Sequence, residues 1–309
     1  MFEIFIRVLP FFAIIALGYG AGRARFFPEE ATAWLTKFVF YFALSAMIFR
    51  FAATLPLDQV FNARLVIGYL WATAFVYGIA TIVGFVRRLD VPTAAIEAQC
   101  AVIGNVGFLG LPMFAILFGE AAIGIVMLVL ATDLIVFSGL IVILINGGRG
   151  EPMTWHLLRT IGLGLLRNPM IVSILSGLTW SALSLPIPGP VDDFLVILGG
   201  AATPGALFAI GASLAQKSTE RMQVALWLSF CKLALHPIFV AFAVLVLFPI
   251  DTFSATVVIS AAALPVAGNV FMLAQHYNIA AQRVSAAILI STVLSVLSVP
   301  LIIALLNSS

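Results

Sequence analysis

Two Gly-Asn-Val triplets, each close to a proline, are the positions of this sequence whose residue types are best suited to binding. Asn105 is the centre of the first triplet and Asn269 the centre of the second, with Pro112 and Pro265 nearby. An asparagine amide can donate and accept hydrogen bonds without carrying a charge. Because proline has no N–H for the helical carbonyl four residues earlier, each triplet predicts a broken helix with unpaired backbone groups.

Both triplets lie within apolar stretches long enough to cross a membrane. Helix breakers at that depth are tolerated only where they line a cavity or are buried in protein, and the N-terminus of a half-helix can hold an anion. Two such breaks in corresponding halves of a chain are typical of the midplane site of a secondary transporter. A single triplet would be explained equally well by a close helix contact or an interhelical hydrogen bond. Together they predict a substrate-binding set, which is Asn105, Gly107, Gly110, Pro112, Pro265, Gly268 and Asn269.

Composition places the chain in a membrane. Of its 309 residues, 63% are hydrophobic and 9% are charged, and the mean hydropathy is +1.18. A soluble domain has roughly 25% charged residues. The chain has no basic patch for nucleic acid, and its three histidines do not share the spacing of metal ligands. We therefore expect an all-α polytopic membrane protein without a metal, another cofactor or a nucleic-acid partner.

Ten apolar runs of about 20 residues, the length that spans a bilayer, can be placed along the chain. They cover approximately residues 2–22, 33–53, 63–86, 94–118, 121–146, 168–185, 191–215, 224–249, 253–275 and 284–306. The links after odd-numbered spans carry most of the basic residues, which are Arg23, Arg25, Lys37, Arg87, Arg88, Arg149, Arg159, Arg167, Lys217, Arg221 and Arg283. The opposite side has only Arg7, Arg50 and Arg64. By the positive-inside rule, the odd links face the cytoplasm and both termini lie outside.

The two halves of the chain resemble each other in sequence. Gly18 corresponds to Gly177, and Phe49 to Phe208, at one common offset, and the two triplets coincide at a similar one. An odd number of spans in each half makes the two copies antiparallel, which is the inverted-repeat plan of secondary transporters. The predicted plan is therefore two inverted five-helix repeats with broken fourth and ninth helices, at 1–146 and 168–309, joined by a cytoplasmic link with an interfacial helix at 147–167.

Two charged residues fall inside predicted spans. Asp133 lies near the centre of the fifth span and Lys232 lies within the eighth. A charge at the centre of an inserted helix costs at least about 2.5 kcal/mol, so such residues are functional candidates by default. We interpret Lys232 as a coupling group or countercharge and Asp133 as its partner. The alternatives are a structural ion pair or, for Lys232, snorkelling to the interface.

Two polar residues near the cytoplasmic end of the fourth span receive a different interpretation. Glu97 and Gln99 lie just inside that end of the span. We expect both side chains to be solvated.

Motifs along the whole chain resemble the auxin efflux carrier family, and in particular its bacterial members. The most specific are the string Gly-Asn-Val-Gly-Phe-Leu-Gly-Leu-Pro at 104–112 and the run from Ala-Leu-Pro to His-Tyr-Asn at 263–278. The segments 167–169 and 232–237 are also similar to the family. One departure is Ser45, which stands where the family commonly has proline, although Pro204 at the corresponding position of the second repeat is retained.

The resemblance implies a carrier in which the fourth and ninth helices cross near their prolines. It implies that spans 1, 2, 6 and 7 form a scaffold that dimerises, and that spans 3–5 and 8–10 form a mobile transport domain. Family substrates are organic anions, auxin in plants and malonate-like dicarboxylates in bacteria, so a bacterial member would lie in the inner membrane. By matching positions, the site residues would be Asn105, Pro112, Pro265 and Asn269.

These features predict a secondary transporter of a small organic anion. We expect an elevator-type homodimer among membrane lipids that is proton-coupled or uncoupled. Two alternatives remain open, a sodium-coupled organic anion symporter of the bile-acid type and a ligand sensor on the same fold that does not transport. Intramembrane hydrolysis would need a coupled nucleophile and base, and no such pair stands out, so we expect no enzyme activity.

Overall fold

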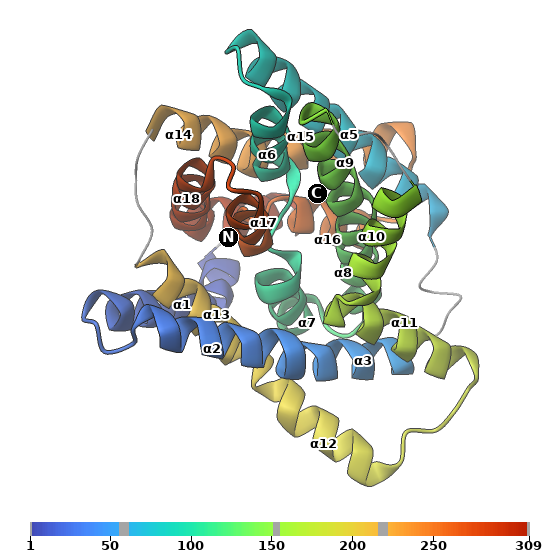
Figure 1. Ribbon diagram of the computed structural model, residues 1–309. Coiled ribbons are helices and arrows are strands. Elements are labelled where there is room, and N and C mark those ends of the chain that lie inside the picture. The colour runs from blue at the N-terminus through green and yellow to red at the C-terminus, as the bar shows by residue number, and fades with distance from the viewer. Residues whose placement is uncertain (1, 56–61, 151–154, 216–221, 308–309) are drawn as a thin grey trace.

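A computed structural model describes residues 2–55, 62–150, 155–215 and 222–307 of the chain (Figure 1). Within these ranges all the named elements are helices, and the one β contact is an isolated antiparallel bridge between Gly104 and Val266. The expectation of an all-α protein is therefore confirmed for the described residues.

The helices of the first half include three π-helical turns, in which the backbone is locally wider than an α-helix. The elements are α1 (Phe2–Arg23), α2 (Glu29–Phe38), η1 (Val39–Ala43), α3 (Leu44–Thr54), α5 (Ala63–Val86), α6 (Val91–Val102), η2 (Val106–Gly110), α7 (Leu111–Phe118), α8 (Ala121–Thr132), η3 (Asp133–Phe137) and α9 (Ser138–Gly148). At Ser45, the position that lacks the family's proline, the hydroxyl donates to the Phe40 carbonyl within the turn η1, at 3.1 Å.

The second half follows the link helix α10 (Trp155–Leu166). Its elements are α11 (Pro169–Ala182), α12 (Gly189–Gly200), α13 (Ala202–Leu214), α14 (Met222–Phe230), η4 (Cys231–Leu235), α15 (His236–Phe242), η5 (Ala243–Leu247), α16 (Thr252–Ala262), α17 (Gly268–Tyr277) and α18 (Ala281–Asn307). Helices therefore occupy all ten apolar runs that the sequence predicts.

Seven helices of the described ranges are long and apolar enough to cross a membrane. They are Ile6–Arg23, Glu29–Thr54, Ala63–Val86, Ala121–Gly148, Gly189–Leu214, Met222–Leu247 and Ala281–Leu306. The fourth, sixth and ninth predicted spans contain only shorter apolar helices, which are Val106–Phe118, Pro169–Ala182 and Thr252–Ala262. The fourth and ninth fall short because a break divides each of them. This is the pattern of a polytopic membrane protein, and ten complete spans remain a prediction.

Two helix pairs at the base of Figure 1 pack in a matching way. α1 packs against α13, and α11 packs against α3. A methyl group added at Gly18 would collide with the carbonyl oxygen of Phe208, and one added at Gly177 would lie 2.7 Å from the carbonyl oxygen of Phe49. These are the residues that correspond between the two halves of the sequence. Only glycine permits such close helix contacts, so the same packing solution is used in both halves.

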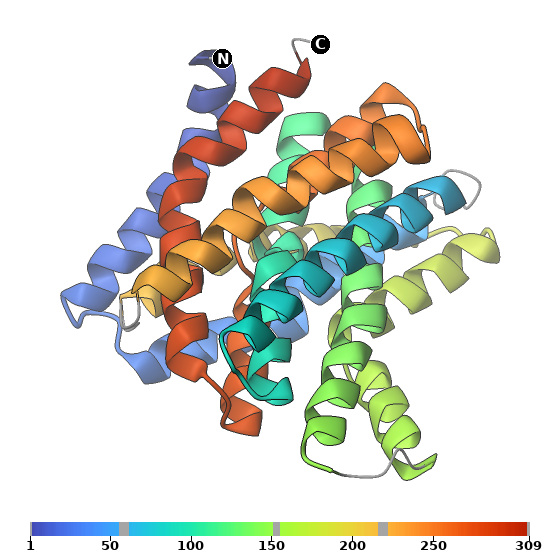
Figure 2. The same cartoon turned by 90° about the horizontal axis from the view of Figure 1, so that it is seen from above.

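The two ends of the described chain lie at the same side of the molecule. Figure 2 shows the start of α1 and the end of α18 at this side and the end of α9 at the opposite side. The link after α9 contains the helix α10, and its position at the cytoplasmic interface stays a prediction. The side chains of Ile161 and Leu165 on this helix line a cavity, which is described below.

The prediction that Glu97 and Gln99 are solvated is wrong. Both residues are only 2% exposed. The two carboxylate oxygens of Glu97 accept from Arg87 at 2.6 Å and from Arg283 at 2.5 Å. Burial of this carboxylate is possible because two arginines, one after α5 and one on α18, neutralise it. Glu97 and the two arginines connect α6 with the end of α5 and with α18, near the start of the fourth predicted span.

Candidate substrate site

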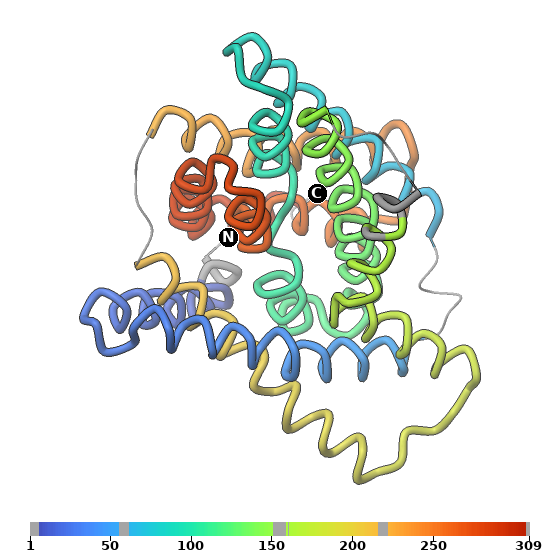
Figure 3. Tube along the Cα trace, viewed as in Figure 1, coloured from blue at the N-terminus to red at the C-terminus, as the bar shows by residue number. Residues whose placement is uncertain are grey.

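The two broken helices meet at the centre of the molecule. The backbone N–H of Asn105 donates to the carbonyl of Pro265 at 2.8 Å, and the N–H of Ala267 donates to the carbonyl of Ile103 at 3.0 Å. These bonds flank the bridge between Gly104 and Val266, so the two uncoiled segments pair in antiparallel fashion. Figure 3 shows the uncoiled trace between α6 and α7 passing the start of α17. Each broken segment thus supplies hydrogen-bond partners for backbone groups of the other.

The carbonyl that lacks a helical N–H partner beside Pro265 is that of Ala262. The regular helix pattern, in which an N–H bonds the carbonyl four residues earlier, predicts Ala261 instead. The Ala261 carbonyl, which lies four residues before Pro265, accepts instead from the N–H of Leu264 at 3.3 Å. The next carbonyl, that of Ala262, accepts a hydrogen bond from the Lys232 ammonium. The N–H of Val266 donates to the Ser291 hydroxyl at 3.1 Å. Side chains of other helices therefore satisfy the backbone on this side of the break.

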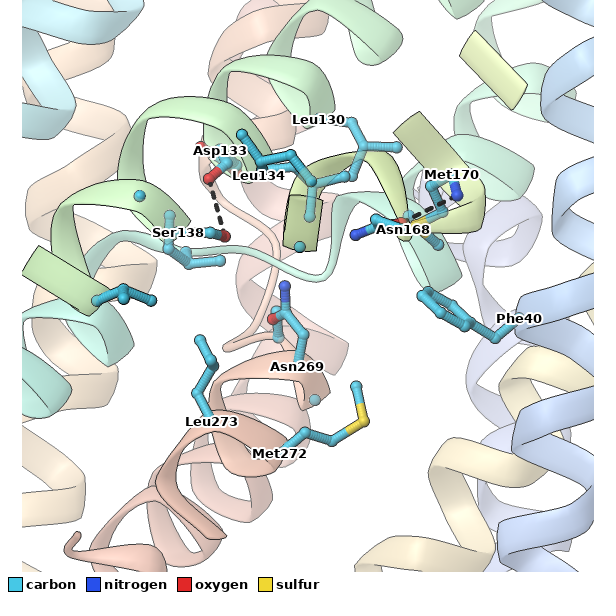
Figure 4. Close-up of a pocket in the computed structure, with 18 of the residues that line it drawn as sticks. Phe40, Leu130, Asp133, Leu134, Ser138, Asn168, Met170, Asn269, Met272 and Leu273 are labelled. Carbon is cyan, nitrogen blue, oxygen red and sulfur yellow. Dashed lines mark hydrogen bonds between the residues drawn. The ribbon is translucent and has the colours of Figure 1, made fainter. Parts of the chain in front are cut away.

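A cavity of about 580 Å³ lies against the crossing segments (Figure 4). Four of the seven predicted binding residues line it, and these are Asn105, Gly107, Gly268 and Asn269. Among the residues that the structure describes, Gly110, Pro112 and Pro265 do not line it. These three position the chain instead: Pro112 lies in the first turn of α7, and a methyl group at Gly110 would lie 2.5 Å from Leu264.

The wall opposite the crossing comes from the second and sixth predicted spans. In Figure 4, Phe40, Asn168 and Met170 lie on one side of the cavity, and Met272 and Leu273 of α17 lie on the other. The rings of Phe40 and Phe108 are stacked, with centroids 6.0 Å apart. A methyl group at Gly107 would lie 2.8 Å from Met170 Cε, so this glycine allows the crossing to approach α11.

The polar groups that face the cavity are incompletely bonded. Asn269 projects from the start of α17 into the cavity, and its Oδ1 has no partner within the described chain. α17 begins at Gly268, and its first N–H groups have no partner within the helix. A methyl group at Gly268 would meet no atom within 4 Å. Free amides and a helix N-terminus at an open cavity can bind a small anion.

The two buried charges lie on different sides of the crossing. Asp133 is 3% exposed and lines the cavity; its Oδ1 accepts from the Tyr69 hydroxyl at 2.9 Å, whereas Oδ2 has no partner in the described part of the chain. Lys232 is completely buried, and it is not among the described residues that line the cavity. Within the same ranges, the two charges form no ion pair within 4.0 Å. Snorkelling does not describe the observed position of Lys232, because its ammonium is in the core.

Several polar residues of this region were not identified from the sequence. His236 was considered from the sequence only as a possible metal ligand, yet it is completely buried and its Nδ1 lies 3.1 Å from Lys232 Nζ. Tyr69 and Thr73 lie one turn apart on α5, and both are at most 1% exposed. Their spacing places both hydroxyls on one face of an apolar helix, which is the signal that could have found them.

A helical membrane protein with a cavity at two paired helix breaks, lined in part by polar groups, has the form of a membrane transporter. Comparison with known proteins agrees, because residues 3–303 match the family described as membrane transport protein. The chain belongs to this family, which is the auxin efflux carrier family. It is an integral membrane transporter rather than an enzyme.

A curated relative matches the whole length of the chain. The chain is 31% identical over 317 residues to a protein of Rhizobium meliloti (strain 1021) named "Putative malonate transporter". The alignment covers 100% of this chain and 97% of the relative.

Proposed function

We propose that the protein is a secondary carrier of a small carboxylate, with malonate-like dicarboxylates as the first substrates to test. The observation that carries this proposal is the cavity at the crossing, which the side-chain amides of Asn105 and Asn269 line beside the N-terminus of α17. Such groups can compensate a carboxylate for its lost hydration. The name of the relative refers to malonate, which is a small dicarboxylate and therefore belongs to the proposed class of substrate.

The proposed architecture is ten membrane spans in two inverted repeats of five. The matched contacts of Gly18 with Phe208 and of Gly177 with Phe49 support it, because an inverted repeat must place corresponding residues in equivalent contacts. The short helices of the fourth and ninth spans fit the plan, since each continues beyond its break.

A labelling experiment tests the orientation that goes with this architecture, in which both termini lie outside the bacterial inner membrane. A single cysteine at Ser309 of a cysteine-free variant should react with an impermeant reagent added outside, and one at Gly147 should not. Gly147 is suited to this test because a side chain there meets no atom within 4 Å. The reverse labelling pattern would exclude the proposed orientation.

The proposed transport movement is a displacement of spans 3–5 and 8–10 against a scaffold of spans 1, 2, 6 and 7, which forms the homodimer. The position of the cavity supports it, because Phe40 and Met170 of the scaffold face Asn105 and Asn269 of the moving part. A site between two such bodies can change its exposure as one slides past the other.

Lys232 has two proposed roles that uptake measurements separate. As a fixed countercharge it would reduce the net charge that moves with the substrate. As a proton carrier it would lose its proton during the cycle, because burial disfavours the charged form of lysine. Sodium coupling is the competing mechanism, in which an inward sodium gradient would be required.

Purified protein in liposomes should be offered labelled malonate and a panel of other mono- and dicarboxylates under imposed pH, sodium and voltage gradients. The proposal predicts saturable uptake of at least one carboxylate without a sodium requirement. Uptake that depends on sodium would favour the bile-acid type of symport. Binding without uptake would indicate a sensor, and neither binding nor uptake of any carboxylate would overturn the proposal.

A further inference from the structure

Five buried side chains form a continuous polar chain between the crossing and the cavity. Lys232 Nζ lies 3.1 Å from His236 Nδ1, and His236 Nε2 lies 3.0 Å from the Thr73 hydroxyl. Thr73 follows Tyr69 by one turn on the same face of α5, so their buried hydroxyl groups are neighbours. The Tyr69 hydroxyl donates to Asp133 at 2.9 Å. None of the five is more than 3% exposed.

The contacts of this chain allow hydrogen bonds in one consistent direction. An ammonium group can only donate, so His236 accepts at Nδ1 when Lys232 is charged. A neutral imidazole that accepts at one nitrogen carries its proton on the other, so Nε2–H donates to the Thr73 oxygen. Thr73 can then donate to Tyr69, and Tyr69 donates to the carboxylate of Asp133. Every donor from the lysine to the carboxylate thus faces an acceptor.

We infer that Lys232, His236, Thr73, Tyr69 and Asp133 form a proton-transfer path between the cavity and the crossing of the broken helices. Lys232 passes a proton to His236 Nδ1, and the imidazole passes its Nε2 proton to Thr73. Thr73 passes its hydroxyl proton to Tyr69, and Tyr69 passes its own to Asp133. The outcome is a neutral lysine and a protonated carboxyl group, with one proton moved and each intermediate group neutral again.

Both ends of the path are placed to link the proton to the substrate. Asp133 lines the cavity, so its proton can be exchanged there. At the other end, a methyl group at Gly104 would lie 3.2 Å from Lys232 Nζ, and Gly104 itself also lines the cavity. An anion in the cavity would favour the charged form of Lys232, and a charged Lys232 would by reciprocity favour the anion. This inference rests on the proposed function, and it adds that transport is coupled to protons.

Few other ionisable groups lie on the helices packed around Lys232. α14 and α16 contain none, α15 contributes His236, and α18 contributes Arg283. α6 contributes Cys100 and Glu97, and the latter is bound to Arg87 and Arg283. α5 contributes Arg64 at its start and Tyr77, which donates to the Ala95 carbonyl at 3.2 Å, besides Tyr69. Cys231 precedes Lys232 on η4. Among the ionisable groups of these described helices, Tyr69, His236 and Asp133 are the ones that the path uses to connect Lys232 to the cavity.

Thr73 is the residue whose replacement tests the path most cleanly, because valine has the same shape without the hydroxyl. Thr73→Val, Thr73→Ser and wild type should be reconstituted and assayed with labelled malonate. Thr81→Val is the matched control on the same helix, since the Thr81 hydroxyl donates only to the Tyr77 carbonyl of its own helix, at 2.8 Å. Two rates are measured, malonate accumulation driven by a proton gradient and malonate exchange without a gradient.

The path predicts that Thr73→Val loses accumulation and keeps wild-type exchange, whereas Thr73→Ser and Thr81→Val keep both. Accumulation by Thr73→Val at the wild-type rate would overturn the inference. Loss of exchange together with accumulation would also overturn it, because the hydroxyl would then act through binding or folding. Wild-type protein that neither accumulates nor exchanges malonate would instead count against malonate as substrate.

A second measurement judges the path without any substrate. Nitrogen NMR of protein labelled with ¹⁵N-histidine in nanodiscs should show one neutral ring with a protonated Nε2, which disappears in His236→Gln. Thr73→Val should shift this signal, and Thr73→Ser should restore it. A ring with both nitrogens protonated, or a signal that is identical in Thr73→Val, would contradict the path.

Discussion

The two faces of the helix crossing satisfy their polar groups in opposite ways. On the cavity face, Asn269 Oδ1 has no partner among described residues, and α17 begins there without a side-chain cap. On the buried face, Lys232 and Ser291 bond the Ala262 carbonyl and the Val266 N–H. The comparison teaches that a broken membrane helix can be completed by the protein on one side while the other side remains available for a ligand.

If this comparison is right, removing a group from the buried face harms the fold, and the largest effect is expected at Lys232. Lys232→Met leaves the Ala262 carbonyl and His236 Nδ1 without a donor, at a cost of about 1–3 kcal/mol of unfolding free energy for each group. Thermal unfolding in detergent measures this, with the exposed Lys37→Met as control. A Lys232→Met variant as stable as wild type would show that the buried face does not depend on this side chain.

Removing a group from the cavity face should harm transport and leave the fold intact. Asn105→Ala and Asn269→Ala each take away amide hydrogen bonds to an anion, a loss of about 1–3 kcal/mol, or roughly 5- to 150-fold in affinity. We expect carboxylate uptake to fall accordingly while the unfolding temperature changes little.

The matched control for the asparagines is Asn146→Ala, because Asn146 donates to Val142 within its own helix α9. Its uptake should equal that of wild type. If both crossing variants transport at the wild-type rate, the substrate binds elsewhere. If both unfold readily, the asparagines belong to the structure rather than to the site.

The smallest effects are expected from two glycines that line the cavity, of which Gly104 also borders the buried Lys232. An added methyl group at Gly104 would lie 3.1 Å from Lys232 Cε, whereas one at Gly268 would meet nothing within 4 Å. Gly104→Ala should therefore lower the thermal unfolding temperature more than Gly268→Ala. Gly268→Ala should instead change the apparent affinity for carboxylates, because its methyl group enters the cavity. The opposite order of stabilities would contradict the assignment of the two faces.

The sequence predicted the position of the crossing better than the groups that complete it. The paired triplets and prolines lead to the breaks because a missing N–H and a glycine act locally. The partners of the breaks are far away in sequence, so helix counting placed the freed carbonyl at Ala261, whereas Lys232 bonds the one at Ala262.

The same limit explains the incorrect prediction for Glu97. The two arginines that neutralise it come from the end of α5 and from α18, and no local pattern shows that they converge. Gly110, Pro112 and Pro265 were predicted as binding residues from their types and, for the two prolines, from matching positions in the family. They are not among the described residues that line the cavity, because which side of the crossing a residue occupies depends on contacts between distant segments.

Protection of a single cysteine at Gly268 tests the central claim, that the cavity face of the crossing binds a small carboxylate. In a cysteine-free variant, Gly268→Cys places a thiol in the open cavity, and Gly147→Cys places one at another position with free space. The account predicts that malonate or another carboxylate of the panel slows modification at Gly268→Cys in a saturable way and leaves Gly147→Cys unaffected. Modification of Gly268→Cys at the same rate with and without every carboxylate tested would contradict it.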